Sequence, residues 1–352
     1  MFPRHTQRLT QSVISFCLCA ISLIASASES DKGKFFGAKH TDYPTWFKES
    51  FLDFKEDLHE ANAAGKRIMI FFHQEGCPYC NALVERNLAQ KDIQQLMKSK
   101  FEVIAINMWG DRELTYINGK QYTEKTLAEA MRVQFTPTLL FFDENGKVIL
   151  RLNGYRAPDR FMVELNYVAK KQEKKFTPRE YIKANFSPSE STHQIHSEPF
   201  FKTGTIDLSA KNKKKPYVIF FEQKDCPDCD TLHEKILPDK EIREILGHFD
   251  VYQVDMWSKD TLTTPSGKKT TARDWAKQLA IEFAPSILVF ERDDKEVIRS
   301  EAFFKLFHTI GILDYVKTGA YKKEPSFQRY LSSRAEKIRE SGKDVNIWKY
   351  TE

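Results

Sequence analysis

The chain has 352 residues, too many for one small domain and enough for two. Hydrophobic residues make up 41% and charged residues 29%, which is ordinary for a protein that buries a core and remains soluble. The net charge is only +5, and basic residues occur in short runs at 170–175 and 211–216. Because these runs lack interleaved aromatic residues, we expect no nucleic-acid partner.

The first 27 residues have the order of a secretory signal peptide. Arg4 and Arg8 precede the apolar run SVISFCLCAISLIASA, whose small-residue end predicts cleavage after Ala27. A membrane anchor is the alternative, although the run is short and interrupted by serines. No other stretch approaches the roughly 18 apolar residues that a membrane helix needs. We therefore expect an exported protein, periplasmic or otherwise extracytoplasmic, that is soluble after cleavage.

Residues 42–174 predict a first α/β domain. It begins with an amphipathic helix, because apolar residues recur at helical spacing over 47–61. The buried strand RIMIFFH (67–73) then leads into a Cys-Pro-x-Cys motif and a helix to about residue 98. A second strand, a helix capped by Thr123, and a hairpin turning at Glu144-Asn145-Gly146 follow, and a helix over 158–174 ends the domain.

Residues 214–320 repeat this pattern. RIMIFFHQEGCPYCNALVERNL (67–88) aligns with PYVIFFEQKDCPDCDTLHEKIL (216–237) at an offset of 149, and the terminal hairpins align at 148. Residues 175–213 show little periodicity and predict a surface connector. Residues 321–352 predict a helical tail that docks onto a domain, with a partner-binding tail as the alternative. The fold class is therefore α/β, with two tandem domains that each have a mixed sheet flanked by helices.

The cysteines indicate redox chemistry. Once the signal peptide is removed, four remain, and all four lie in the two motifs: Cys77, Cys80, Cys226 and Cys229. A cysteine that opens a helix meets unpaired N–H groups, which favour the thiolate. Cys77 and Cys226 are therefore predicted to attack disulfides, and Cys80 and Cys229 to resolve the mixed disulfides. Pro78 and Pro227 suit the first helical turn.

Two other uses of these motifs fit less well. A haem tether needs histidine directly after the second cysteine, where Asn81 and Asp230 stand. A zinc site would need the two pairs to converge from about 149 residues apart, so no metal is predicted.

The order of elements resembles the thioredoxin fold, here present twice. The resemblance implies cis-prolines that face the cysteines and shape the substrate platform, and they match Thr136-Pro137 and Ala284-Pro285. The segments GKRIMIFFHQEGCPYC and RLNGY resemble, more narrowly, the exported SoxW-like family. That resemblance implies protein disulfide substrates, no cofactor, and a reductant role with electrons from a membrane-embedded thiol reductase. Disulfide oxidation or isomerisation, and a non-catalytic protein-binding scaffold, are the alternatives.

The motifs depart from thioredoxin at several positions. Gly76 and Asp225 replace its tryptophan, Phe71 and Phe220 its buried acid, and Tyr79 and Asp228 are the variable residues that tune each motif. The reduction potential of thioredoxin therefore cannot be transferred to this chain. Four carboxylates crowd the second motif, at positions 222, 225, 228 and 230. They predict a higher thiol pKa for Cys226 than for Cys77, and hence a more reducing second pair.

Other polar and aromatic residues are weaker candidates. His73 precedes the first motif and could accept a proton, with Glu222 as its counterpart in the second copy. Trp109 and Trp257 follow the next strand in each copy, and they favour packing over substrate contact. The remaining histidines, His193, His196 and His233 among them, show no metal-ligand spacing and are expected at the surface.

Overall fold

The computed structural model describes residues 32–188, 190–211 and 213–350. The predicted signal peptide, residues 1–27, lies outside the described residues. Within the described ranges, no helix combines the length and the apolar character needed to span a bilayer.

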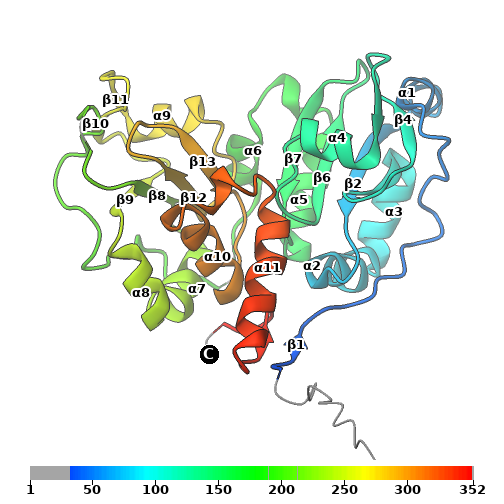
Figure 1. The fold of residues 1–352 in the computed structure, drawn as a ribbon. Helices are drawn as coiled ribbons and strands as arrows, with labels where there is room; N and C mark the ends of the chain where they lie inside the picture. The colour runs from blue at the N-terminus through cyan, green and yellow to red at the C-terminus, as the bar shows by residue number, and fades with distance from the viewer. Residues whose placement is uncertain (1–31, 189, 212, 351–352) are drawn as a thin grey trace, which may run out of the picture.

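Each domain has a four-stranded mixed sheet, as the sequence predicted (Figure 1). In the first domain the strand order is β3-β2-β6-β7, with β2 parallel to β3 and antiparallel to β6. A short β-hairpin and a 3-10 turn lie outside the sheet. The elements of this domain are α1 (Phe54–Ala63), β2 (Arg67–His73), α2 (Pro78–Ala82), the π-helix η2 (Leu83–Leu88), α3 (Lys91–Lys100), β3 (Phe101–Asn107), β4 (Glu113–Thr115), β5 (Gln121–Thr123), α4 (Glu124–Ala130), β6 (Thr138–Phe142), β7 (Val148–Asn153), α5 (Pro158–Ala169) and η3 (Gln172–Lys174).

Both faces of the first sheet are buried, because helices cover each of them. Along β2, Phe71 contributes to one apolar cluster and Phe72 to another. Helices α3 and α5 cover the first face, and α1 and α4 cover the second. A strand buried on both sides reads as a continuous apolar run, which explains the composition of RIMIFFH.

The second domain has the same topology, with the strand order β13-β12-β8-β9. Its elements are β8 (Tyr217–Glu222), α7 (Pro227–Thr231), the π-helix η4 (Leu232–Ile236), α8 (Lys240–Leu246), β9 (Asp250–Asp255), β10 (Thr261–Thr263), β11 (Lys269–Thr271), α9 (Ala272–Gln278), β12 (Ser286–Phe290), β13 (Glu296–Ser300), α10 (Leu306–Lys317) and η5 (Ala320–Lys322). One apolar cluster contains residues of both domains, so the two sheets share a continuous core.

The first helix differs from the prediction. It begins at Phe54 rather than near residue 47, because the Asp53 side chain caps it by accepting hydrogen bonds from the N–H groups of Lys55 and Glu56. Phe51, predicted on its buried face, is 100% exposed. Phe47 is buried separately, with its ring 5.9 Å from that of Phe71.

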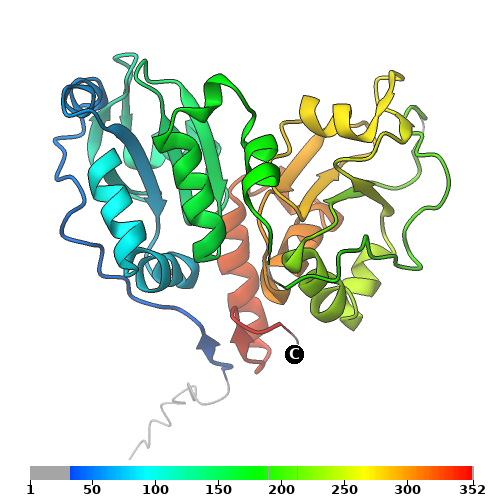
Figure 2. The ribbon, with the colours of Figure 1, turned by 180° about the vertical axis from the view of Figure 1, so that it is seen from behind.

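The connector also differs from the prediction, because it contains helix α6 (Pro178–Asn185). Thr177 and Glu180 form a capping box at its start, a local signal that a search for long periodicity misses. The backbone N–H of Arg179 donates to Glu282 of the second domain over 2.7 Å. Helix α6 therefore lies between the two domains (Figure 2).

The C-terminal segment lies against both domains. Helix α11 (Phe327–Glu340) runs between them in Figure 1. From it, Gln328 donates to the carbonyl of Gln134 over 2.9 Å, and Arg334 pairs with Glu241 at 2.7 Å. Beyond the helix, β14 (Val345–Asn346) pairs in parallel with β1 (Phe35–Phe36).

Candidate active site

Each Cys-Pro-x-Cys motif joins the end of a central strand to a short helix. Cys77 is the N-cap of α2 and Cys226 that of α7, with Pro78 and Pro227 in the first turn of these helices. Each pair is a disulfide, with Cα–Cα distances of 5.3 Å and 5.1 Å. The N–H of Cys80 points at Cys77 Sγ over 3.1 Å, and that of Cys229 at Cys226 Sγ over the same distance. A thiolate at either first cysteine would thus accept a backbone hydrogen bond.

Both predicted proline platforms lie beside the first cysteines. The Thr136-Pro137 and Ala284-Pro285 peptide bonds are cis. Cys77 Sγ lies 3.5 Å from the carbonyl oxygen of Thr136, and Cys226 Sγ lies 3.6 Å from that of Ala284. The structure therefore brings the predicted site residues together in two nearly identical arrangements, one in each domain.

The first motif faces the second domain. Tyr79 is 5% exposed, and its ring contacts Phe304 edge-on at 5.7 Å. Phe304 also stacks at 4.7 Å on Phe135, which directly precedes the Thr136-Pro137 bond. Burial raises the pKa of Tyr79 far above its usual range, so its phenol is neutral. The predicted substrate platform of the first domain is thus bordered by an aromatic residue of the second.

The second motif faces the first domain in the corresponding way, but with charged residues. Phe283 precedes the Ala284-Pro285 bond, and the Arg156 guanidinium lies 4.0 Å from its ring. Arg160 lies 4.5 Å from the same ring. Burial raises the pKa of Asp228, while Arg160 and Arg156 act in the opposite direction. Asp228 and Arg156 therefore occupy the places that Tyr79 and Phe304 hold at the first site.

Two glutamines that the sequence analysis did not single out support the motifs. Gln74 accepts a hydrogen bond from Trp109 Nε1 over 2.9 Å and donates to Thr136 Oγ1 over 3.0 Å. In the second domain, Gln223 accepts the same bond from Trp257 Nε1 at 2.9 Å. In both copies the glutamine stands three residues before the first cysteine, so the alignment of the two repeats could have identified it. Each tryptophan therefore packs in its domain and also fixes, by a hydrogen bond, the glutamine that precedes the motif.

Three of the four carboxylates around the second motif pair with histidines: Glu222 with His233, Asp225 with His193, and Asp230 with His196. The fourth, Asp228, is influenced by the charges of Arg160 and Arg156. These partners offset part of the negative charge on which the sequence argument for a higher Cys226 pKa depends. That argument stays a prediction.

His233 is not the surface residue that the sequence suggested. It is 5% exposed and lies between Glu222 and Glu198, with both ring nitrogens 3.1 Å from a carboxylate oxygen. Burial alone would lower the pKa of His233, but hydrogen bonds to the two glutamates outweigh it and raise the pKa. The histidine therefore neutralises a buried carboxylate on the strand that leads into the second motif.

His73 and Glu222 do not share one chemistry. Burial lowers the pKa of His73 to about 4, so the imidazole is neutral at pH 7, and its ring lies 4.4 Å from that of Tyr43. Glu222 is fully buried and accepts hydrogen bonds from His233 and Gln253. In the described part of the chain, neither side chain is hydrogen-bonded to a cysteine. No group of three or more potential metal ligands occurs there either.

Comparison with known proteins places the chain in a family. The sequence pattern of the thioredoxin-like domain matches residues 54–169 and 206–316, which together are more than half of the chain. The chain therefore belongs to the thioredoxin-like family and carries its domain twice, each with a Cys-x-x-Cys disulfide. No curated protein matches it. The narrower SoxW-like resemblance stays a prediction.

Several solved structures are similar at low identity. A thioredoxin-fold protein from Helicobacter pylori is 24% identical and covers 34% of this chain and 84% of its own, with a TM-score of 0.30. A thioredoxin from Thermus thermophilus is 24% identical over 40% of this chain and 89% of its own, with a TM-score of 0.28. The first two thioredoxin domains of Saccharomyces cerevisiae Eps1p are 11% identical over 73% and 94%, with a TM-score of 0.24.

Proposed function

We propose that this protein is an exported thiol–disulfide oxidoreductase that exchanges disulfides with protein substrates at two sites, as a reductant. One observation carries the proposal. In both domains, the first cysteine begins a helix, accepts an N–H from the second cysteine and lies beside a cis X–Pro carbonyl. Two copies that keep the same arrangement favour chemistry over a structural disulfide or a binding scaffold.

The reaction transfers two electrons to the substrate. The Cys77 thiolate attacks a substrate disulfide, forms a mixed disulfide and releases one substrate thiolate, which takes up a proton. Cys80 then loses its proton and attacks Cys77 Sγ, which forms the Cys77–Cys80 disulfide and releases the second substrate thiolate. Cys226 and Cys229 would act in the same way. No metal or organic cofactor takes part, because the cysteines carry the electrons.

Exposure distinguishes the roles within each pair. Cys77 is 4% exposed and Cys80 is fully buried, while Cys226 and Cys229 are 4% and 1% exposed. Cys77 lines the cavity beside the first motif and Cys226 the cavity beside the second, so a protein disulfide would reach these sulfur atoms. Burial disfavours a free thiolate on the second cysteine, which suits a group that ionises only as it resolves the mixed disulfide.

A reductant must itself be reduced, and a membrane-embedded thiol reductase is the donor that the SoxW-like resemblance implies. The direction is tested by equilibrating the full chain and two single-pair variants, C77S/C80S and C226S/C229S, in glutathione and in dithiothreitol buffers. Potentials below about −250 mV support a reductant, and potentials above about −180 mV would assign it to the oxidants and isomerases. A pair that forms no disulfide across the range would favour a binding role for its domain.

Export is tested separately. Expression with the native N-terminus, cell fractionation and N-terminal sequencing should give an extracytoplasmic protein that begins after Ala27. A cytoplasmic, uncleaved product would contradict this part of the proposal.

A further inference from the structure

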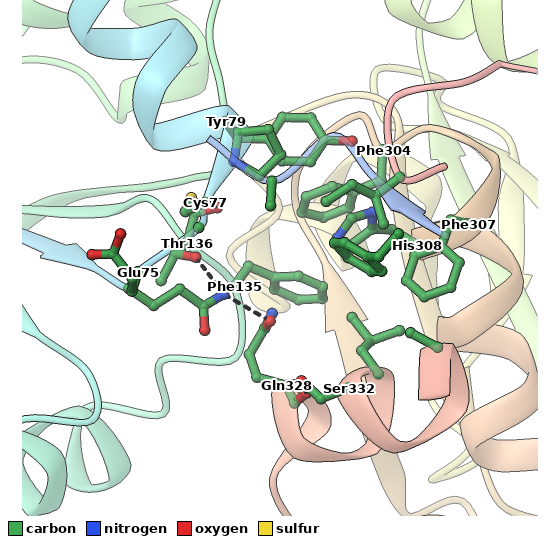
Figure 3. Close-up of a pocket in the computed structure, with 18 of the residues that line it drawn as sticks. Glu75, Cys77, Tyr79, Phe135, Thr136, Phe304, Phe307, His308, Gln328 and Ser332 are labelled. Atoms are coloured by element: carbon green, nitrogen blue, oxygen red, sulfur yellow. Dashed lines mark hydrogen bonds between the residues drawn. The ribbon is translucent and has the colours of Figure 1, made fainter. Parts of the chain in front are cut away.

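A cavity of about 320 Å³ opens beside Cys77, and most of its wall comes from outside the first domain. The side that belongs to the first domain consists of residues 74–79, which include Cys77, together with Phe135 and Thr136. The opposite side comes from the second domain and the C-terminal segment, through Phe304, Phe307, His308, Leu331, Ser332, Ala335 and Ile347. Figure 3 shows the labelled members of both sides converging on one space next to Cys77.

The part of this wall that the second domain and the C-terminal segment contribute is mainly aromatic and aliphatic. The Phe304 ring stacks on that of His308 at 5.6 Å, and Phe307 meets His308 edge-on at 5.5 Å. His308 Nδ1 is buried and has no hydrogen-bond partner within the described residues. Three charged residues also line the cavity: Glu336 and Arg339 pair with each other at 2.9 Å, and Glu75 lies 3.0 Å from His40 Nδ1. Such a wall favours an apolar occupant and disfavours a charged one.

The cavity is continuous with the place where a substrate chain would lie. It shares Cys77 and Thr136 with the peptide platform, so a residue next to the attacked cysteine would reach it. Gln74 joins the two parts, because its amide nitrogen donates both to Thr136 Oγ1 at 3.0 Å and to Gln328 Oε1 of α11 at 2.9 Å. This continuity favours a side chain of the substrate protein over a free small molecule.

The cavity beside the second motif has more charged residues in its lining. This cavity of about 210 Å³ is lined by Arg156, Asp159, Arg160 and Asp228, where the first site has aromatic residues. The two copies of the domain thus differ: mainly aromatic side chains of the other domain lie beside the first cysteine pair, and charged side chains lie beside the second.

We propose that the cavity beside Cys77 receives an aromatic or large aliphatic side chain adjoining the substrate's reactive cysteine. The first site therefore selects disulfides with apolar flanks, and residues outside its own domain set this selectivity. The inference rests on the proposed function, since it names the substrate class of that same site.

The test uses the full chain with the second site disabled by C226S/C229S. Dithiothreitol drives the reduction of synthetic peptides with one intramolecular disulfide, which differ only in phenylalanine, alanine or aspartate beside the attacked cysteine. We expect kcat/KM for the phenylalanine peptide to exceed that for the alanine peptide about tenfold, with the aspartate peptide slowest. Equal rates for the three peptides would overturn the inference.

Two variants locate the selectivity. Ser332 lines the cavity and is exposed at its rim, so Ser332→Phe should fill it and bring the phenylalanine preference close to one. Ser333→Phe is the matched control, because Ser333 is exposed on the same helix but does not line the cavity. Phe307→Ala should widen the cavity and move the preference toward a tryptophan-flanked peptide. A preference that neither change alters would overturn the inference, whereas failure to reduce any peptide would contradict the proposed function itself.

Discussion

His308 should make this protein less stable in mild acid. Its imidazole is enclosed by the rings of Tyr79, Phe304 and Phe307, at centroid distances between 5.4 and 5.6 Å. Burial lowers the pKa of His308 to about 4, whereas an unfolded histidine titrates near 6.5. No carboxylate acts in the opposite direction, since burial alone accounts for the change.

The sign follows from proton binding in the two states. Above about pH 6.5 neither state holds a proton on His308, so the full stability is present. As the pH falls from 6.5 toward 4, the unfolded chain binds a proton that the folded protein cannot, and stability is lost. At about 1.36 kcal/mol for each pKa unit, the largest loss is about 3 kcal/mol, and partial exposure of the ring reduces it to about 2 kcal/mol.

The test compares urea unfolding, followed by tryptophan fluorescence, at pH 7.5 and pH 4.5. His308→Leu removes the titrating group, so its loss of stability between these pH values should be about 2 kcal/mol smaller than that of the parent. His59→Leu, at an exposed position on α1, is the control and should keep the parental loss. If His308→Leu kept the full pH dependence, burial of this imidazole would be refuted as the cause of the loss of stability in acid.

Three further predictions concern charged groups. Arg67 is 4% exposed and pairs with two glutamates at 2.7 and 2.9 Å, so Arg67→Met should lower the free energy of unfolding by about 3 kcal/mol in urea titrations. Lys66→Met, which removes a more exposed ion pair, is the control and should lower it by less than about 1 kcal/mol. Equal losses for the two variants would contradict the reasoning. Arg160→Gln should raise the pKa of Asp228 further, because the charge of Arg160 is the strongest influence that lowers this pKa. NMR titration of the carboxyl group measures the change, and an unchanged pKa would show that the two groups do not interact. Alkylation rates against pH should give Cys226 a higher thiol pKa than the first-site nucleophile, and an equal or lower pKa would show that the arginines and histidines around it outweigh the carboxylates.

The sequence predicted the fold well because its signals are local and occur twice. The run RIMIFFH is apolar throughout, since helices cover both sides of β2, and its copy in β8 confirms the pattern. Thr123 caps α4 as expected, with its hydroxyl accepting the N–H of Thr126. Where the signal was short the prediction failed. Apolar spacing extended the first helix back to residue 47, although the Asp53 cap decides that it begins at Phe54.

The cysteines and prolines of the site could also be predicted from the sequence, but the residues that surround them could not. His233 was expected at the surface because its partners, Glu222 and Glu198, are 11 and 35 residues away in the sequence, so no local pattern connects them. The contact between Tyr79 and Phe304 joins residues of different domains, and nothing within either repeat indicates it. Long-range contacts of this kind depend on how the two domains dock, which the periodicity of one domain does not encode.

The docking of the two domains brings corresponding positions of the two copies to one interface. Gly154 and Ala302 correspond in the repeat and meet at the interface, where a Cβ on Gly154 would lie only 2.9 Å from the Ala302 Cβ. Two residues further along each repeat, Arg156 and Phe304 lie near the motif of the opposite domain. A change in one domain therefore alters the surroundings of the other domain's cysteines. Because each cysteine pair has surroundings that the other domain helps to form, we expect that neither domain alone would reproduce the reactivity of its own pair.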